Sequence, residues 1–211
     1  MAKQSIGLGA APNDGNGDPA RDAFNKCNQN FDEIYVALSN TGAGLNLPIV
    51  CNGSHPADQG PLLQDTNHQV LFGDAIGGNI FNVTGDIDLD TAGAFNVNET
   101  GDYLFFMNLN YGRTGSSQVA RVNVRALLNG GQIGGSGSDW HAGQNDRLSK
   151  STTFRLSLTA GDVLTIEIVR DSSAGSANDG GLFAITPTSS GWNPVPSASM
   201  AVSKINTDLV E

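Results

Sequence analysis

The sequence has few basic residues, and these are scattered along the chain. Its 211 residues include 11 Lys and Arg against 21 Asp and Glu, so the formal net charge at pH 7 is −10. A nucleic-acid backbone is repelled by such a protein at long range, so no nucleic-acid partner is expected. The chain also lacks a run of 18 apolar residues, and its start, MAKQSIGLGAAP, lacks the apolar stretch of a secretory signal. We therefore expect that the protein is made in a cytosol and does not insert into a membrane.

Cysteine and histidine are also scarce. Cys27 and Cys51 are not in a CxxC spacing, and we interpret both as free thiols. His55, His68 and His141 stand apart from one another and from the cysteines. The chain has no phosphate-binding glycine loop, no HExxH motif and no recognisable order of nucleophile, base and acid. No metal, no cofactor and no catalytic residues are therefore predicted.

Glycine and short polar residues are abundant, with 27 glycines and only 15% charged residues. This composition is typical of short strands joined by turns. Alternating apolar residues predict strands at 101–111, 121–128, 153–158 and 162–171, and shorter ones at 70–72, 94–97, 181–187 and 199–205. In the first of these, the side chains expected to share one face are Tyr103, Phe105, Met107, Leu109 and Tyr111. Because no helix separates the strands, the sequence predicts an antiparallel sandwich or jelly roll.

One helix is predicted, over residues 18–39. Asp18 is a suitable N-cap and Pro19 suits the first helical position. Apolar residues follow at spacings of three and four, and the seam they form consists of Phe24, Cys27, Phe31, Ile34 and Leu38. A helix of this length is marginal alone in water, so the seam should be buried. Its partner is either another copy of the helix or the β domain of the same chain.

The predicted organisation has four parts. Residues 1–40 form an N-terminal segment, and residues 41–67, rich in proline and without periodicity, are interpreted as a linker or arm. Residues 68–206 form the β head, and residues 207–211 a short tail.

Three aspartates at alternate positions, Asp86, Asp88 and Asp90, share one face of a predicted strand. A calcium loop would place Gly at the sixth position and Glu at the twelfth, where this chain has Thr91 and Val97. Carboxylates for glycoside cleavage would need a second carboxylate facing this strand. We therefore interpret the three aspartates as a solvated edge.

The segment GSDWHAGQNDR, residues 137–147, is interpreted as a polar insertion between two strands, with Trp140 and His141 at its centre. An exposed indole there could stack on a sugar, which makes these two residues a candidate recognition loop for a surface glycan. The alternative is that Trp140 packs on the sheet or on a neighbouring subunit. Trp192, in SGWNPVP, raises the same question.

Several strings of the β head resemble those of a known family. FNVNETGDYLFFMNLNY, VNVRALLNGG, FRLSLTAGDVLTIEIVRD and SMAVSKI are similar to the globular head shared by complement-type and tumour-necrosis-factor-like proteins. This resemblance implies a jelly roll that trimerises through flat strand faces, often with aromatic residues at the threefold axis. It gives Tyr103, Phe105 or Tyr111 a second possible place, in a subunit interface.

The N-terminal pattern NDGxGDxxRxAFxKxNxNFxEIY, from Asn13 to Tyr35, resembles the start of tailed-phage structural proteins, including trimeric tail fibres and baseplate components. Cys27 stands where that family usually has an aliphatic residue. The resemblance implies a trimerising attachment segment, and hence a non-enzymatic virion protein, made in the host cytoplasm, that binds other virion proteins through this segment. A capsid decoration protein or head fibre is an alternative. A glycan-binding or glycan-cleaving host-recognition protein is a second alternative.

Overall fold

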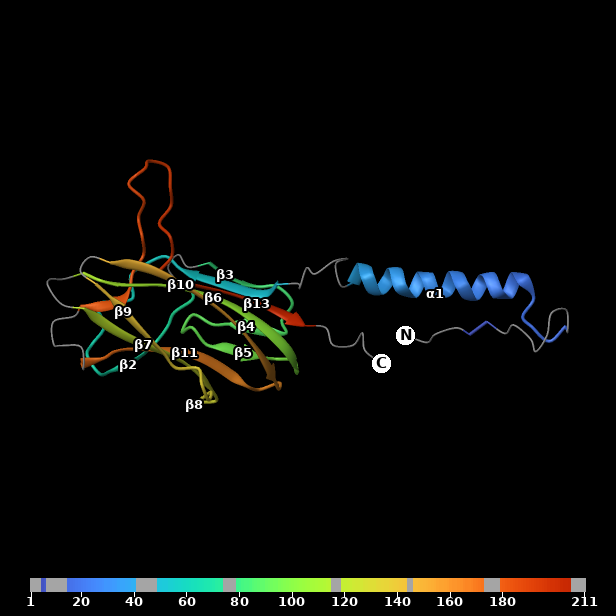
Figure 1. The fold of residues 1–211 in the computed structure, drawn as a ribbon, viewed down its shortest axis with the longest axis horizontal. Helices are drawn as coiled ribbons and strands as arrows, with labels where there is room; N and C mark the ends of the chain where they lie inside the picture. The colour runs from blue at the N-terminus through green and yellow to red at the C-terminus, as the bar shows by residue number, and fades with distance from the viewer. Residues whose placement is uncertain are drawn as a thin grey trace. The chain divides into compact units, whose positions relative to one another are not determined.

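In the computed structural model the chain forms two compact units, residues 1–48 and 49–211 (Figure 1). The structure describes residues 5–6, 15–40, 49–73, 79–114, 119–143, 146–172 and 179–205. In these ranges no helix combines the length and the apolar character needed to cross a membrane.

The first unit contains the predicted helix, α1 (Ala20–Asn40). It begins where Asp18 and Pro19 predicted a start, because the Pro19 carbonyl accepts the backbone N–H of Ala23 at 2.9 Å. Lys26 reaches back over two turns, and its Nζ lies 2.6 Å from Asp18 Oδ2. This ion pair connects the helix to the residue that precedes it.

The second unit is a sandwich of two sheets. Within the described residues sheet A has six strands: in spatial order β10 (Arg147–Leu158), β6 (Gly101–Arg113), β13 (Ala198–Ile205), β1 (Ile49–His55) and β3 (Asn79–Asn82), with β12 (Gly180–Leu182) also paired to β6. Sheet B has seven in the same part of the chain: β4 (Ile87–Leu89), β5 (Phe95–Val97), β11 (Val163–Arg170), β7 (Ala120–Leu128) and β8 (Gly131–Gln132), with β2 (Asn67–Gln69) paired to β11 and β9 (Ser138–Ala142) to β7. Paired strands run antiparallel, as in β10 with β6 and β11 with β7. The predicted fold class, a mainly β antiparallel jelly-roll sandwich with a short N-terminal helix, is confirmed.

The core between the sheets is centred on aromatic rings. Phe105 of β6 lies 5.9 Å from Phe95 of sheet B and stacks on Phe154 of the neighbouring strand β10, with ring centroids 5.0 Å apart. Phe72 packs against Phe95 at 5.7 Å. Tyr103 and Phe105 are fully buried in this core, so the core, and not a subunit interface, is their place.

The interpretation of residues 41–67 as a linker is wrong for residues 49–67. They contain β1, an inner strand of sheet A between β13 and β3, in which Cys51 is fully buried. The strand was missed because its sequence, IVCNGSH, has few large apolar residues. It contains Gly53, where a Cβ would lie 2.2 Å from Leu89 Cδ2 and 2.3 Å from the Phe72 carbonyl oxygen. Close packing, which sequence hydrophobicity does not report, requires a glycine here.

Both cysteines are free, as predicted, but they differ in environment. Burial, assisted by the negative charge of Asp88, raises the pKa of the Cys51 thiol to about 12. Cys27 in α1 is only partly buried.

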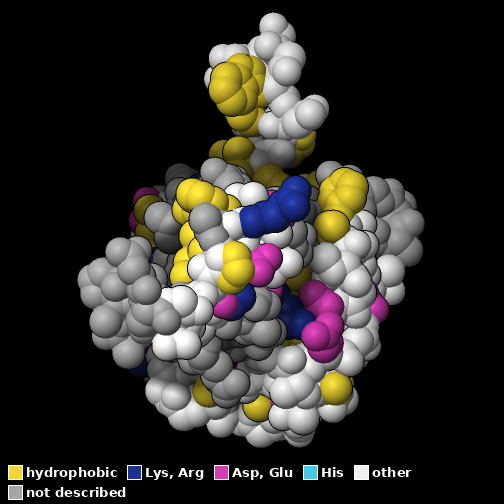
Figure 2. All heavy atoms as spheres, turned by 90° about the vertical axis from the view of Figure 1, so that its right-hand side faces the viewer, with side chains coloured by type: hydrophobic (Ala, Val, Ile, Leu, Met, Phe, Trp, Pro, Cys, Tyr) yellow, Lys and Arg dark blue, Asp and Glu magenta, His cyan; other side chains and the backbone are white. Residues whose placement is uncertain are grey.

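The segment between β12 and β13 leaves the sandwich and returns to it, and it forms the orange-red projection in Figure 1 and the protrusion at the top of Figure 2. Its first and last residues, Phe183 and Ser197, are fully buried in the sandwich.

Two substitutions of one kind test this core. Leu109 of β6 is fully buried, whereas Leu63 is 66% exposed. We expect Leu109→Ala to lower the free energy of unfolding by about 2 to 5 kcal/mol, because it removes buried methyl groups and leaves a cavity. Leu63→Ala should change it by about 0.5 kcal/mol or less. Urea unfolding of both variants measures the difference, and equal losses would contradict the assignment of the core.

Candidate functional site

The segment around Trp140 is not the exposed loop that the sequence suggested. Residues 138–142 form β9, in which alternate side chains point inward, and Trp140 is only 7% exposed. Its ring packs against that of Tyr111, with centroids 5.1 Å apart. The alternative, in which Trp140 packs on the sheet, is correct. His141 points to the other side, and its Nε2 lies 3.3 Å from Asp139 Oδ2.

Strand β9 brings acidic and basic side chains together on the outer face of sheet B. Asp139 lies opposite Asn123 and His141 opposite Arg121 in the pairing of β9 with β7. Arg121 Nε donates to both carboxylate oxygens of Asp139, at 2.8 and 3.0 Å. This hydrogen bonding, more than any other interaction, holds the pKa of the Asp139 carboxyl below its usual range. A second carboxylate, that of Asp171, lies 3.8 Å from the same guanidinium.

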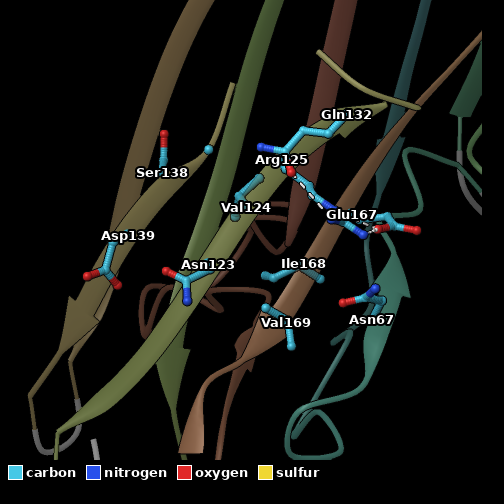
Figure 3. A pocket seen from close by; sticks show the side chains of 11 residues that line it. Asn67, Asn123, Val124, Arg125, Gln132, Ser138, Asp139, Glu167, Ile168 and Val169 are labelled. Carbon is cyan, nitrogen blue, oxygen red and sulfur yellow. Dashed lines mark hydrogen bonds and ion pairs between the residues drawn. The ribbon is translucent and has the colours of Figure 1, made fainter. Parts of the chain in front are cut away.

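A groove of about 340 Å³ crosses this face, next to the Arg121 pair (Figure 3). On one side Arg125 donates to Glu167 at 2.6 and 2.9 Å, and to the Gln132 side-chain oxygen at 3.3 Å. Asp139 lies on the opposite side of the groove from Glu167, as Figure 3 shows. Among the lining residues, Arg125 is thus engaged with Glu167 and Gln132, and Asp139 with Arg121 outside the groove.

The two carboxylates of the groove lie on different strands and are held by different arginines. Asp139 is in β9 and Glu167 in β11, with β7 between them, and their register along the strands differs by two residues. Standard strand spacings then put their backbones roughly 12 Å apart. Since each carboxylate is also bound to an arginine, the groove is a hydrogen-bonding surface.

The three aspartates around β4 have local structural roles. Asp86 accepts a hydrogen bond from Thr84 at 2.8 Å, Asp88 one from Asn98 at 2.7 Å, and Asp90 two from backbone amides of the turn that follows it, both at 2.9 Å. Within the ranges that the structure describes, no group of three His, Cys, Asp or Glu side chains is placed to hold a metal ion.

The predicted helical seam is exposed where its side chains are described. Phe24 is 71% and Phe31 57% exposed, and Cys27 lies partly buried between them. The side chains of Ile34 and Leu38 lie outside the described residues. Two phenylalanines seven residues apart thus form an apolar stripe along α1.

A second apolar surface was not predicted from the sequence. Phe106 of β6 points away from the core and is 41% exposed, and Phe81 of β3 is 54% exposed. Strand pairing places them in one row across sheet A, Phe106 beside Ala201, Ala201 beside Asn52, and Asn52 beside Phe81. We call this row, with the neighbouring outward side chains Asn108, Ser199 and Ser54, the sheet A face. The available indication was the run LFFM, in which alternation directs Phe105 inward and Phe106 outward.

The sheet A face carries no charge at its centre. The nearest outward charged groups in the same strands are at one end, where Arg155 and Asp102 form an ion pair at 2.6 Å. The centre of the face is thus uncharged and carries two exposed phenylalanines, a residue type that is enriched in protein interfaces.

No family model matches the chain, and no curated protein matches it. Among solved structures, it is similar to murine APRIL at pH 5.0, with 12% identity and a TM-score of 0.44 over 75% of this chain and 100% of that one. It is also similar to Eiger TNF from S. frugiperda, with 16% identity and a TM-score of 0.41 over 75% and 93% of the two chains. Murine APRIL at pH 8.5 gives 13% identity and a TM-score of 0.42 over 74% and 98%. These likenesses concern the fold alone.

The Arg121–Asp139 pair can be tested by titration. Because the folded pKa of Asp139 is lowered, its contribution to stability is present above the unfolded value of about 3.9 and is lost as the pH falls through the folded value. We expect Arg121→Gln to raise the pKa of Asp139, because the guanidinium that stabilises the carboxylate is gone. Carboxyl-detected NMR measures this shift.

Asp102 provides the control for that titration. Its pKa is also lowered, by hydrogen bonds from Ser157 and then from Arg155, but it lies in sheet A. Its titration should be the same in Arg121→Gln as in the wild type. A wild-type Asp139 that titrates in the ordinary range would contradict the described geometry.

Proposed function

We propose that the protein is a non-enzymatic structural protein of a tailed-phage virion. In this proposal it is a homotrimer, a tail-fibre or baseplate component anchored through its N-terminal segment that displays the β head. The observation that carries the proposal is the exposure of Phe24 and Phe31, one heptad apart on α1.

The exposed stripe of α1 is energetically unfavourable in an isolated chain. Burial of a phenylalanine side chain contributes roughly 1.5 to 3 kcal/mol, so Phe24 and Phe31, which are more than half exposed, each leave about 1 to 2 kcal/mol unrealised. Association of three helices through the a and d positions would bury both residues in every copy. Self-association of the helix would therefore explain why Phe24 and Phe31 are exposed in a single chain.

The N-terminal pattern supports the virion assignment through the residues that build the helix start. Asp18 and Lys26 both belong to the pattern that resembles phage attachment segments, and they form the 2.6 Å ion pair described above. Phe24 and Phe31 also belong to it. The pattern thus combines one contact that fixes the start of the helix with the two side chains offered for association.

The sheet A face supports a trimer of the heads. Its centre is uncharged, and Phe106 lies between the small or polar side chains of Ala201 and Thr153. Packing of this face around a threefold axis would give Phe106 the central position that the resemblance to tumour-necrosis-factor-like heads implied for an aromatic residue of this strand. Phe106 follows Phe105 in β6, the strand that also contains Tyr103 and Tyr111, the other two residues that the sequence suggested.

The oligomeric state tests the proposal directly. Light scattering should give a mass three times the 21.9 kDa of the chain. Phe24→Ser combined with Phe31→Ser should lower this mass or shift dissociation to higher protein concentration, because the apolar stripe is removed. Leu63→Ser, at an exposed leucine outside both surfaces, is the matched control and should leave the mass unchanged. A wild-type monomer at all concentrations would contradict the proposal.

Deletion of the N-terminal segment tests whether this segment anchors the protein and the β head folds without it. Since residues 49–211 form a compact unit with their own core, a chain without residues 1–48 should give the β-sheet circular dichroism of the intact head. It should not enter virions when it replaces the full chain during infection. Normal incorporation of this folded head would place the anchor elsewhere.

A further inference from the structure

A projection closed by backbone hydrogen bonds connects β12 and β13. Residues 184–196, which we call the finger, leave the sandwich as shown in Figure 1, and a backbone bridge closes them above their base. Ile185 N–H donates to the Val195 carbonyl at 3.0 Å, and Val195 N–H donates to the Ile185 carbonyl at 2.8 Å. Beyond this bridge lies Trp192, which is 70% exposed.

The base of the finger is fixed in the sandwich. The ring of buried Phe183 has the Arg147 guanidinium 4.1 Å from its centroid. The buried side chain of Asn110 donates to the Pro196 carbonyl at 2.5 Å. Ala184 N–H donates to Asp58 at 2.7 Å. A projecting segment held at both ends loses little conformational freedom when it binds a ligand.

The finger itself also has restricted backbone freedom. Pro187, Pro194 and Pro196 fix φ at three positions. Gly191, with φ of +86°, makes the turn that presents Trp192. The indole is therefore displayed on a preorganised support.

The finger has no charged side chain. None of residues 184–196 is acidic or basic in a chain with a net charge of −10. Figure 2 shows the protrusion with hydrophobic side chains in yellow among white ones, without blue or magenta. Around Trp192 stand the hydroxyls of Ser189 and Ser190 and the amide of Asn193, all exposed. Tryptophan with serine, glycine and asparagine is the composition of antibody binding loops, in which the aromatic ring anchors and the small polar groups hydrogen-bond.

We propose that the finger is a binding site for a neutral saccharide, with the Trp192 indole stacked on the apolar face of a sugar ring. Ser189, Ser190 and Asn193 are the hydrogen-bonding partners of the ring hydroxyls. The absence of charge matches a neutral ligand, since an anionic or cationic one would require a compensating group.

The size of the contact favours a saccharide over a protein partner. A tryptophan contributes 150 to 250 Å² of burial, and the other exposed apolar side chains of the finger, Pro194 and Val195, are smaller. A stable protein interface buries about 800 Å² on each partner. A membrane surface would be bound through basic residues beside the aromatic one, and the finger has none.

The inference rests on the proposed function in one respect. A single indole contact is weak, and a trimer that presents three fingers to a repeated surface polymer gains affinity through multivalency. The contact itself belongs to each chain and is present in a monomer.

Binding of the full-length protein to an array of neutral and anionic oligosaccharides tests the site. We expect binding to one or more neutral glycans, a loss of about tenfold or more in Trp192→Ala, and retention of most of it in Trp192→Tyr, which keeps an aromatic face. The mass by light scattering should not change in either variant. Absence of wild-type binding to neutral glycans, or equal binding by Trp192→Ala, would overturn the proposal.

Fluorescence locates the contact. The chain has two tryptophans, so Trp140→Phe leaves Trp192 as the only one. Its emission should be quenched by iodide, and the glycan found on the array should protect it from quenching. Protection that rises with protein concentration without glycan would mean that a second copy covers the finger, and would overturn the saccharide assignment. If the protein is a monomer that binds glycan, the proposed trimer is wrong and the finger site stands. If it is a trimer that binds no glycan, the finger site is wrong and the proposed trimer stands.

Discussion

The stack of Phe105 on Phe154, continued to Phe95 and Phe72, is the contact on which the sandwich depends. It joins β10 to β6 within sheet A and reaches across to sheet B, with centroid distances of 5.0, 5.9 and 5.7 Å. Once Phe105 is fixed inward, strand alternation directs Phe106 outward. The same strand therefore supplies the centre of the core and the centre of the sheet A face.

Charge is distributed unequally over the two sheets. The outer face of sheet B carries two bridged arginines, Arg121 and Arg125, with their carboxylates, whereas the centre of the sheet A face and the finger carry none. Water stabilises the first kind of surface, and contact with another molecule stabilises the second. The head thus has one side with exposed ion pairs and two sets of residues without charge, which are the surfaces of the two proposals above.

The long strands could be predicted from the sequence because β6 and β11 repeat apolar residues over enough positions to reveal a period of two. The same reasoning located α1 and its stripe. It missed β1, whose burial depends on the close approach at Gly53, and it read β9 as a loop because only Trp140 and Ala142 alternate there. It singled out Trp140 and gave Trp192 less weight. The exposure of an indole depends on which strand lies opposite it. The local sequence does not contain that information.

The Ile185–Val195 bridge that closes the finger separates positions at which a mutation affects the core from positions at which it does not. Residues 186–194 lie beyond the bridge, while Phe183 and Ser197, which belong to the core, lie before it and after it. We expect insertions, deletions and substitutions in those nine positions to leave the packing of both sheets intact. The segment is therefore an exchangeable cassette, at which new sequences can be introduced by natural variation or by an engineer while the scaffold is retained.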